Sequence, residues 1–422
     1  MKLRLFALLA CAYLLVASRE PPWGDSHVVY DTTQALLERG RLDVNLGGPP
    51  QFYAIREGKK YGVFPLGNVI AMVPSYVTYK ALRIIPHKPA VDELLFRLCS
   101  HLSSSLIVAG VCVLFFAMAR REGATERVAL WLALGLGTST ILLVYARAPF
   151  SEGLQALCLT WVVERTLTLG DRLSRRGAIL LGLACGLLFN TKLVYAGAIM
   201  TVPIYLAIRH RRRLGELVTC LVLAGIPLAL LVGGAVAHNW LKTGTLTDTG
   251  YRIPNGVFSG DAYAALDGFF FSTGKSVFLY SPLLVLGFLA FPSWWRQDRA
   301  RAGFVLAITA VVTLMNAKFR YWHADYCWGP RLLVPVVPVW LLPAAPWIEG
   351  ALRQGRPRLR ADLVDAGQSV QEPAQRGLAG GDVGEVGNGC RARGGRHRPS
   401  IGLMGKRQTI CRVAEVARSR DG

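Results

Sequence analysis

Charged residues are scarce in this chain of 422 residues. Asp, Glu, Lys and Arg make up 18% of the sequence, hydrophobic residues make up 52%, and the mean hydropathy is +0.35. Because a soluble globular protein carries about 25% charged residues, this composition excludes a single water-soluble core. The apolar residues instead fall in about ten runs separated by short charged segments, the pattern expected of repeated bilayer crossings.

Acidic residues and paired cysteines are scarcer still. The sequence has 27 Asp and Glu against 48 Lys and Arg, a net charge of +21. Many of the cations stand in short clusters directly after apolar runs, which favours cytoplasmic membrane anchors over a nucleic-acid surface. The nine cysteines form no CxxC pair that would hold a metal or a redox disulfide, so we interpret them as small core hydrophobes.

The positions of the basic clusters predict the topology. The first apolar stretch, residues 3–17, spans only about 22 Å as a helix, less than a hydrocarbon core of about 30 Å. A cleaved signal peptide is one interpretation, but the later apolar runs favour an uncleaved first helix with a cytoplasmic N-terminus. The basic clusters then all fall in the cytoplasm. The other runs are 97–119, 128–146, 153–169, 178–189, 193–208, 217–237, 277–295, 302–315 and 332–347, and the clusters are 120–121, 172–176, 209–213, 296–301 and 353–360.

Residues 63–85 are also apolar but do not fit this topology as a full crossing, because they would place the first three basic clusters outside. Pro65, Gly67 and Pro74 interrupt the segment, so we expect a re-entrant or interfacial helix on the outer side. The predicted fold is an all-α polytopic membrane protein with about ten transmembrane helices plus this outer helix.

Three stretches are left on the outer side, residues 18–85, 238–276 and 316–331, and functional residues are expected there. Within the first, residues 27–40 show apolar residues at helical spacing and end at a glycine. This pattern predicts an amphipathic helix on the membrane surface, with Asp31 solvated on its polar stripe.

The C-terminal tail differs from the rest of the chain. From residue 353 onward it has 14 basic residues, 7 acidic residues, 13 glycines and no Phe, Trp or Tyr. Such a composition cannot bury a core. We therefore expect residues 1–350 to form one membrane domain and residues 351–422 to be a disordered basic tail. Off-frame translation of a GC-rich gene is a second interpretation that the composition leaves open.

Four short motifs occur in order along the predicted outer stretches. They are Gly-Asp-Ser-His at 24–27, GKKYGVFPLG at 58–67, APFSE at 148–152 and WHADYCWGPR at 322–331. Together they resemble membrane glycosyltransferases of the GT-C fold, the group that contains protein O-mannosyltransferases and the lipid A aminoarabinose transferase. The resemblance covers about residues 1–350. This sequence departs from the family pattern at Leu66 and Gly153, where proline is usual.

The resemblance implies transfer of a sugar from a polyprenyl-phosphate donor to a lipid, glycan or protein acceptor. The active site would lie on the extracytoplasmic side of an inner or plasma membrane. Such a reaction needs a base for the acceptor hydroxyl, cations for the departing phosphate and an apolar groove for the isoprenoid tail. No P-loop or Rossmann fingerprint is present, which disfavours nucleotide sugars.

Two carboxylates and one arginine are the principal candidates. Asp25, beside Gly24 in the first outer loop, is the candidate base, and its alternative role is an N-cap. Glu152 is the second catalytic candidate, and its alternative is an interfacial carboxylate in a first helical turn. Arg331 follows a Gly-Pro pair and is the candidate for the donor phosphate, with a snorkelling anchor as its alternative.

Further cations and aromatic residues are weaker candidates. Lys59, Lys60 and Arg320 are candidates to assist at the phosphate, although interfacial cations commonly meet lipid headgroups. Aromatic residues can stack on a sugar, although many simply form interfacial belts. No cofactor is predicted, and a divalent metal is a minor alternative because a His with an Asp is too small a set. The candidate sugar- or acceptor-binding residues are Tyr61, Trp322, His323, Asp325 and Trp328.

Two other functions remain as alternatives. A transporter or lipid flippase would also need about ten helices, but the apolar runs are nearly free of charge and show no internal repeat. A non-catalytic membrane assembly factor would use the outer loops as docking surfaces.

Overall fold

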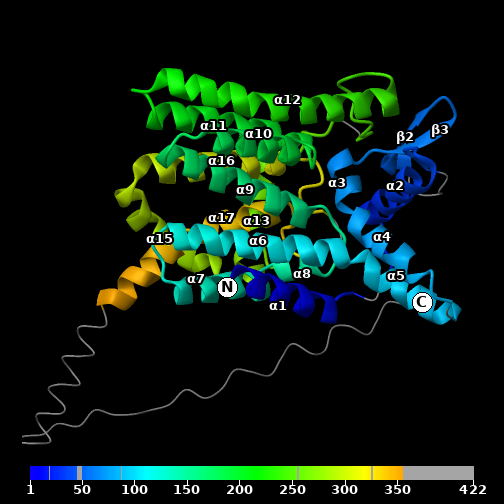
Figure 1. Ribbon diagram of the computed structural model, residues 1–422, viewed down its shortest axis with the longest axis horizontal. Coiled ribbons are helices and arrows are strands. Elements are labelled where there is room, and N and C mark those ends of the chain that lie inside the picture. Colours follow the sequence, from blue (N-terminus) through cyan, green and yellow to red (C-terminus); the bar gives the residue numbers. More distant parts are fainter. Residues whose placement is uncertain (19, 45–49, 87, 254–255, 325–326, 355–422) are drawn as a thin grey trace, which may run out of the picture. The chain divides into compact units, whose positions relative to one another are not determined.

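Helices account for nearly all of the regular structure, as predicted (Figure 1). The computed structural model describes residues 1–18, 20–44, 50–86, 88–253, 256–324 and 327–354. The expectation of a disordered tail falls almost entirely outside these residues and stays a prediction. The helices of the membrane domain are α1 (Lys2–Leu15), α6 (Leu102–Arg121), α7 (Glu126–Thr138), α8 (Leu142–Ala146), α9 (Glu152–Asp171), α10 (Arg175–Phe189), α11 (Ala196–Arg209), α12 (Leu214–Thr243), α13 (Ala262–Phe270), α14 (Val277–Tyr280), α15 (Leu284–Gln297), α16 (Arg299–Ala317) and α17 (Val337–Leu341), with 3₁₀ turns η2 (Leu193–Tyr195) and η3 (Arg331–Val336).

Several helices are long and apolar enough to cross a bilayer. Within the described residues, four helical stretches meet this criterion by length and composition: Pro89–Arg121, Leu214–Thr243, Arg299–Ala317 and Arg331–Gln354. A shorter apolar helix covers Leu193–Arg209. The chain is therefore an all-α membrane protein, whereas the number of about ten crossings stays a prediction.

Small residues set the distance between α10 and α12. A Cβ atom at Gly182 would lie 1.9 Å from the carbonyl oxygen of Ala224, and one at Gly186 would lie 2.7 Å from a methyl group of Leu231. The two helix backbones therefore approach closely where glycine removes the side chain, as is common between membrane helices.

Gly182→Ala should consequently destabilise the fold by about 1–3 kcal/mol, because the added methyl group forces the two helices apart. Gly225→Ala on α12 is the matched control, since a Cβ there meets nothing within 4 Å. Thermal unfolding of both purified variants checks this. Equal unfolding midpoints for the two variants would contradict the close packing.

The first outer stretch folds into a small subdomain of helices and a sheet. Three short strands pair antiparallel in the order β1-β3-β2, and η1 precedes β2. The sheet packs on α2 through a separate apolar cluster that includes Val28, Val63 and Phe64. The elements are α2 (Asp25–Arg39), β1 (Asp43–Val44), η1 (Pro50–Phe52), β2 (Tyr53–Arg56), β3 (Lys59–Gly62), α3 (Leu66–Ala71), α4 (Val73–Leu82) and α5 (Pro89–Ser100).

The helix predicted over residues 27–40 is confirmed as α2, and Gly40 ends it in the left-handed conformation with φ of 63°. The expectation that Asp31 is solvated is wrong. Its side chain is only 15% exposed and lies 3.3 Å from the imidazole of His27. Burial raises the pKa of Asp31 to about 6, against the opposing effect of His27.

The single outer helix expected over residues 63–85 is two helices. Pro65 precedes α3, and Met72 separates α3 from α4, which has Pro74 in its first turn. The division falls where the prolines stand, because proline fits a helix start but not a helix interior. Ile70, Val77 and other apolar residues of this segment are exposed, as expected of an element at a membrane interface.

Candidate functional site

Arg331 binds the two carboxylates that the sequence singled out. Its Nη2 donates to Oδ2 of Asp25 at 2.7 Å, and its Nε donates to Oε1 of Glu152 at 2.6 Å. The Asp25 side chain is 32% exposed, whereas those of Glu152 and Arg331 are 3% and 12% exposed. The three residues therefore form one cluster, defined here as the Arg331 cluster, in which only Asp25 is substantially open to solvent.

Helix starts hold all three side chains in place. Asp25 is the first residue of α2, Glu152 is the first residue of α9, and Arg331 opens η3. The alternative of Asp25 as an N-cap is wrong, because Gly24 takes that position with φ of 56° and no side chain caps the helix. Carboxylates in first helical turns are favoured by the helix dipole, and both Asp25 and Glu152 stand at such positions.

Aromatic packing orients the guanidinium. Arg331 lies over the ring of Phe150 at 4.5 Å, and Phe150 packs edge-on against Trp23 at 5.4 Å. The hydroxyl of Tyr145 donates to the carbonyl of Trp328 at 3.1 Å and ties the segments before α9 and η3 together. The APFSE motif (148–152) and the last four residues of the WHADYCWGPR motif (328–331) therefore pack together at the cluster.

Gly329 lets the chain make the turn into Arg331. Its φ is 56°, and a Cβ there would lie 2.7 Å from Ile141 and 2.8 Å from Tyr280. A larger residue would both strain the backbone and displace these neighbours.

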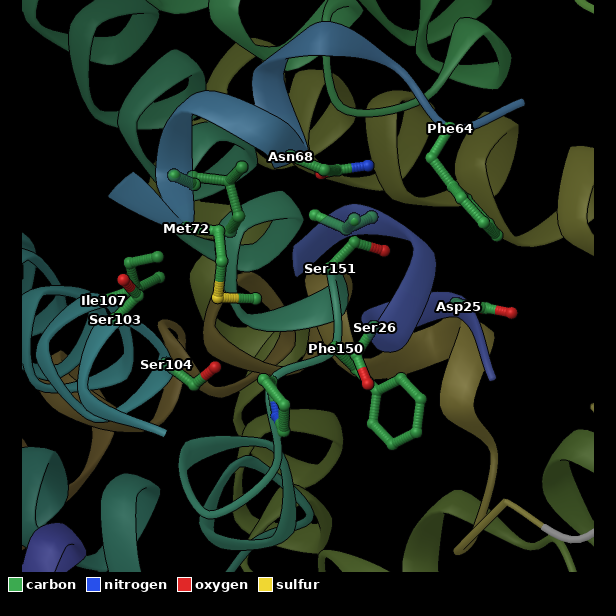
Figure 2. Close-up of a pocket in the computed structure, with 14 residues that line it drawn as sticks. Asp25, Ser26, Phe64, Asn68, Met72, Ser103, Ser104, Ile107, Phe150 and Ser151 are labelled. Atoms are coloured by element: carbon green, nitrogen blue, oxygen red, sulfur yellow. The ribbon is translucent and has the colours of Figure 1, made fainter. Parts of the chain in front are cut away.

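An open pocket adjoins the cluster (Figure 2). It holds about 420 Å³ of space, part of it open to solvent, and combines hydroxyl groups with apolar side chains. Figure 2 shows Asp25 at one side of the pocket and Met72, Ser103 and Ile107 at the other. The labelled lining residues are Asp25, Ser26, Phe64, Asn68, Met72, Ser103, Ser104, Ile107, Phe150 and Ser151. The lining mixes hydroxyl, carboxylate and apolar groups, which suits an amphiphilic ligand.

Lys192 is a cation near the cluster that the sequence analysis missed. Its side chain forms no hydrogen bond or ion pair with the described residues, and its Nζ lies 5.2 Å from the ring centre of Phe319. Burial lowers the pKa of Lys192, and the nearby carboxylates of Glu152 and Asp25 partly oppose this effect. One feature of the sequence could have identified it, because Lys192 is the single charged residue between positions 177 and 208.

The outer subdomain holds the turn that carries Lys192. The backbone N–H of Gly67 donates to the carbonyl of Asn190 at 3.2 Å, and the Asn68 amide donates to the carbonyl of Thr191 at 3.3 Å. A Cβ at Gly67 would lie 2.6 Å from the Asn190 oxygen. The glycine of the GKKYGVFPLG motif is therefore required for this close approach, and the contact fixes Lys192 beside a pocket-lining residue, Asn68.

The other predicted residues lie elsewhere on the outer stretches. Lys59 and Lys60 are exposed on β3, and Tyr61 is buried beneath them. Arg320 is half-buried, with its backbone N–H bonded to Val257, and no printed contact joins its side chain to Arg331.

The aromatic candidates likewise include both packed and exposed side chains. Trp322 packs edge-on against Phe269 and fills the space over Gly268, and Trp328 is 68% exposed. His323 packs edge-on against Trp322 at 5.6 Å, and Asp325 lies outside the described residues. Within the part of the chain that the structure describes, no group of three His, Cys, Asp or Glu residues is placed to hold a metal ion.

Comparison with known proteins gives a structural likeness without a sequence match. No protein family matches the sequence, and no curated protein is similar to it in sequence. The structure is similar to the crystal structure of ArnT from Cupriavidus metallidurans bound to undecaprenyl phosphate, with a TM-score of 0.52 and 17% identity over 81% of this chain and 59% of that chain. The apo form of ArnT gives a TM-score of 0.48 and 17% identity over 90% of this chain and 65% of that one.

The chain spans less than two thirds of the length of either ArnT structure. The likeness to the lipid-bound form nevertheless covers 81% of this chain. The helical membrane fold expected from the four motifs is confirmed, because the chain is similar in fold to the lipid-bound ArnT structure.

Proposed function

We propose that this chain transfers a sugar from a polyprenyl-phosphate donor to a lipid, glycan or protein acceptor on the extracytoplasmic side of the membrane. The observation that carries the proposal is the Arg331 cluster, in which two carboxylates from separate helices meet one guanidinium at the edge of a pocket. The structurally similar ArnT was crystallised with undecaprenyl phosphate, which supports a lipid phosphate as the donor group.

Exposure divides the roles of the two carboxylates. Asp25 lines the pocket and is the more open of the two, so it takes the proton of the acceptor hydroxyl as that oxygen bonds to the sugar carbon. The bond from the sugar carbon to the phosphate oxygen breaks in the same step, and the lipid phosphate leaves. Glu152 is buried and positions Arg331.

Charge balance separates the roles of the two cations. Arg331 already faces two carboxylates, so its charge is more than neutralised. Lys192 has no such partner among the described residues, and its turn joins two apolar runs whose far ends carry the basic clusters 172–176 and 209–213. The positive-inside rule therefore supports an outer position for Lys192, on the same side as Asp25. Lys192 is therefore the cation that binds the departing phosphate, with Arg331 aligned beside it.

Lys192→Gln should lower the transfer rate by about 10²-fold, the effect typical of losing one donor to a developing anion. Because the lysine pKa is lowered from 10.5, the rate should also fall as the pH rises through that lowered value. Lys192→Arg should keep activity at alkaline pH, since guanidinium stays charged. Initial rates between about pH 7 and 10 measure both effects.

The control is Lys88→Gln, which removes an exposed lysine of the outer subdomain that is not a candidate site residue and should change the rate less than twofold. A rate for Lys192→Gln within threefold of the parent, or the same alkaline decline in Lys192→Arg, would remove Lys192 from the mechanism.

The donor class tests the whole proposal. Purified full-length chain is offered an undecaprenyl-phosphate-linked sugar or a nucleotide sugar, each with mixed lipid, glycan and peptide acceptors. Transfer should occur from the lipid-linked donor alone. Efficient turnover of a nucleotide sugar without added lipid would discard the proposed function.

A further inference from the structure

A second, strongly basic pocket lies at the other end of the membrane helices. It is formed where α9 ends, α11 ends and α12 begins, and most of its lining side chains are charged or polar. The charged residues of the lining are Asp171, Arg172, Arg209, Arg211, Arg213 and Glu216. Nothing in the proposed transfer reaction uses this pocket.

Part of the positive charge is already used to hold helices together. Arg209 donates to Asp298 at 3.0 Å and lies 3.6 Å from Asp171, which also accepts from Arg301 at 2.8 Å. These ion pairs connect α9, α11 and α16. The carboxylates of Asp298 and Asp171 therefore neutralise the charge of Arg209.

The other arginines that line the pocket have few carboxylate partners. Among the described residues Arg172 and Arg211 form no ion pair, and Arg213 reaches Glu216 only at 4.0 Å. All three are exposed. The pocket therefore presents several guanidinium groups that no carboxylate of the described chain neutralises, a favourable setting for a phosphate group.

An apolar surface adjoins the arginines directly. Ile204 and Ile208 are exposed at the end of α11, and Leu214 and Val218 are exposed at the start of α12. The exposed stripe continues along α12, of whose most apolar window only 11% is buried inside the protein. Cations beside a lipid-facing apolar stripe match a molecule with an anionic head and an acyl tail.

The pocket and the Arg331 cluster lie on opposite sides of the bilayer. The 30 residues of α12 extend about 45 Å, more than the hydrocarbon thickness of about 30 Å. The helix begins at the basic pocket, and its far end meets the outer subdomain, where Arg56 donates to the carbonyl of Trp240 at 2.6 Å and Lys242 donates to that of Val63 at 3.1 Å (Figure 1). A ligand of this pocket is therefore separate from the donor.

We propose that this pocket binds the phosphate-bearing headgroup of an anionic phospholipid of the cytoplasmic leaflet. Arg211 and Arg213 donate to the phosphate oxygens, and the acyl chains lie along the exposed stripes of α11 and α12. The bound lipid bridges the ends of these two helices.

The test measures binding of a short-chain lipid to the full chain in neutral detergent. Dioctanoyl phosphatidylglycerol is titrated into the parent, into the double variant Arg211→Gln/Arg213→Gln and into the control Arg175→Gln/Arg176→Gln. The control removes the same charge from exposed arginines on the same side that do not line the pocket. We expect saturable binding that weakens by about tenfold or more in the pocket variant and less than twofold in the control.

Two soluble comparisons identify the ligand class. Dioctanoyl phosphatidylcholine tests for dependence on net negative charge, and inorganic phosphate tests for recognition of phosphate without the tail. Equal losses in both double variants, equal affinity for the two lipids, or inorganic phosphate binding as tightly as phosphatidylglycerol would each overturn the proposal. Thermal unfolding without lipid verifies that all variants are folded.

Discussion

Asp25→Asn is expected to lower the rate of sugar transfer by about 10²- to 10⁴-fold, the usual contribution of a positioned general base. Asparagine keeps the shape of the side chain and can still accept the hydrogen bond from Arg331, but it has no basic oxygen. The unfolding temperature should barely change, because Asp25 is partly exposed and Gly24, not Asp25, caps α2.

The measurement compares initial rates on equal amounts of folded protein with saturating lipid-linked donor. Asp31→Asn is the control, since it makes the same change six residues later on α2, where the carboxylate faces His27 and not Arg331. Turnover by Asp25→Asn within threefold of the parent would be too small a loss for a base. The role would then pass to Glu152.

Arg331→Met should have the largest effect on stability, about 3–5 kcal/mol. The substitution leaves the carboxylate of Glu152 buried and without its cation, whereas Asp25 retains contact with solvent. Adding Glu152→Gln to the same chain removes the unpaired charge and should restore most of the lost stability. Transfer should not return, because the cluster no longer holds a cation.

Thermal unfolding of the single and double variants checks this expectation. Arg83→Met provides the control, because Arg83 is 54% exposed and its ion pair with Asp92 should contribute less than about 1 kcal/mol. A double variant that is no more stable than Arg331→Met would contradict the assignment of Glu152 as the buried partner of Arg331.

The helical membrane fold and the identity of the cluster residues were predictable from sequence, but their contacts were not. Apolar runs and basic clusters report bilayer crossings directly. The ion pairs of Arg331 join residues 306 and 179 positions apart. No local pattern encodes such a contact, and only the order of the motifs indicated it.

The small sheet and Lys192 escaped prediction for different reasons. The strands are two to four residues long, too short for an alternating pattern to stand out. The hairpin between β2 and β3 turns at Glu57 and Gly58, both with positive φ, and Glu is an unusual residue there. Lys192 is a lone cation between two apolar runs, where a snorkelling anchor is the ordinary interpretation.

The central claim is that the Arg331 cluster and Lys192 form the site of the lipid phosphate. It is tested most directly by a cryo-electron microscopy structure of the full chain in a lipid nanodisc with undecaprenyl phosphate. The account predicts phosphate density about 3 Å from Lys192 Nζ, beside Arg331 and within reach of the pocket that Asp25 lines. A phosphate bound only at the basic pocket around Arg211, or anywhere else away from Lys192 and Arg331, would contradict it.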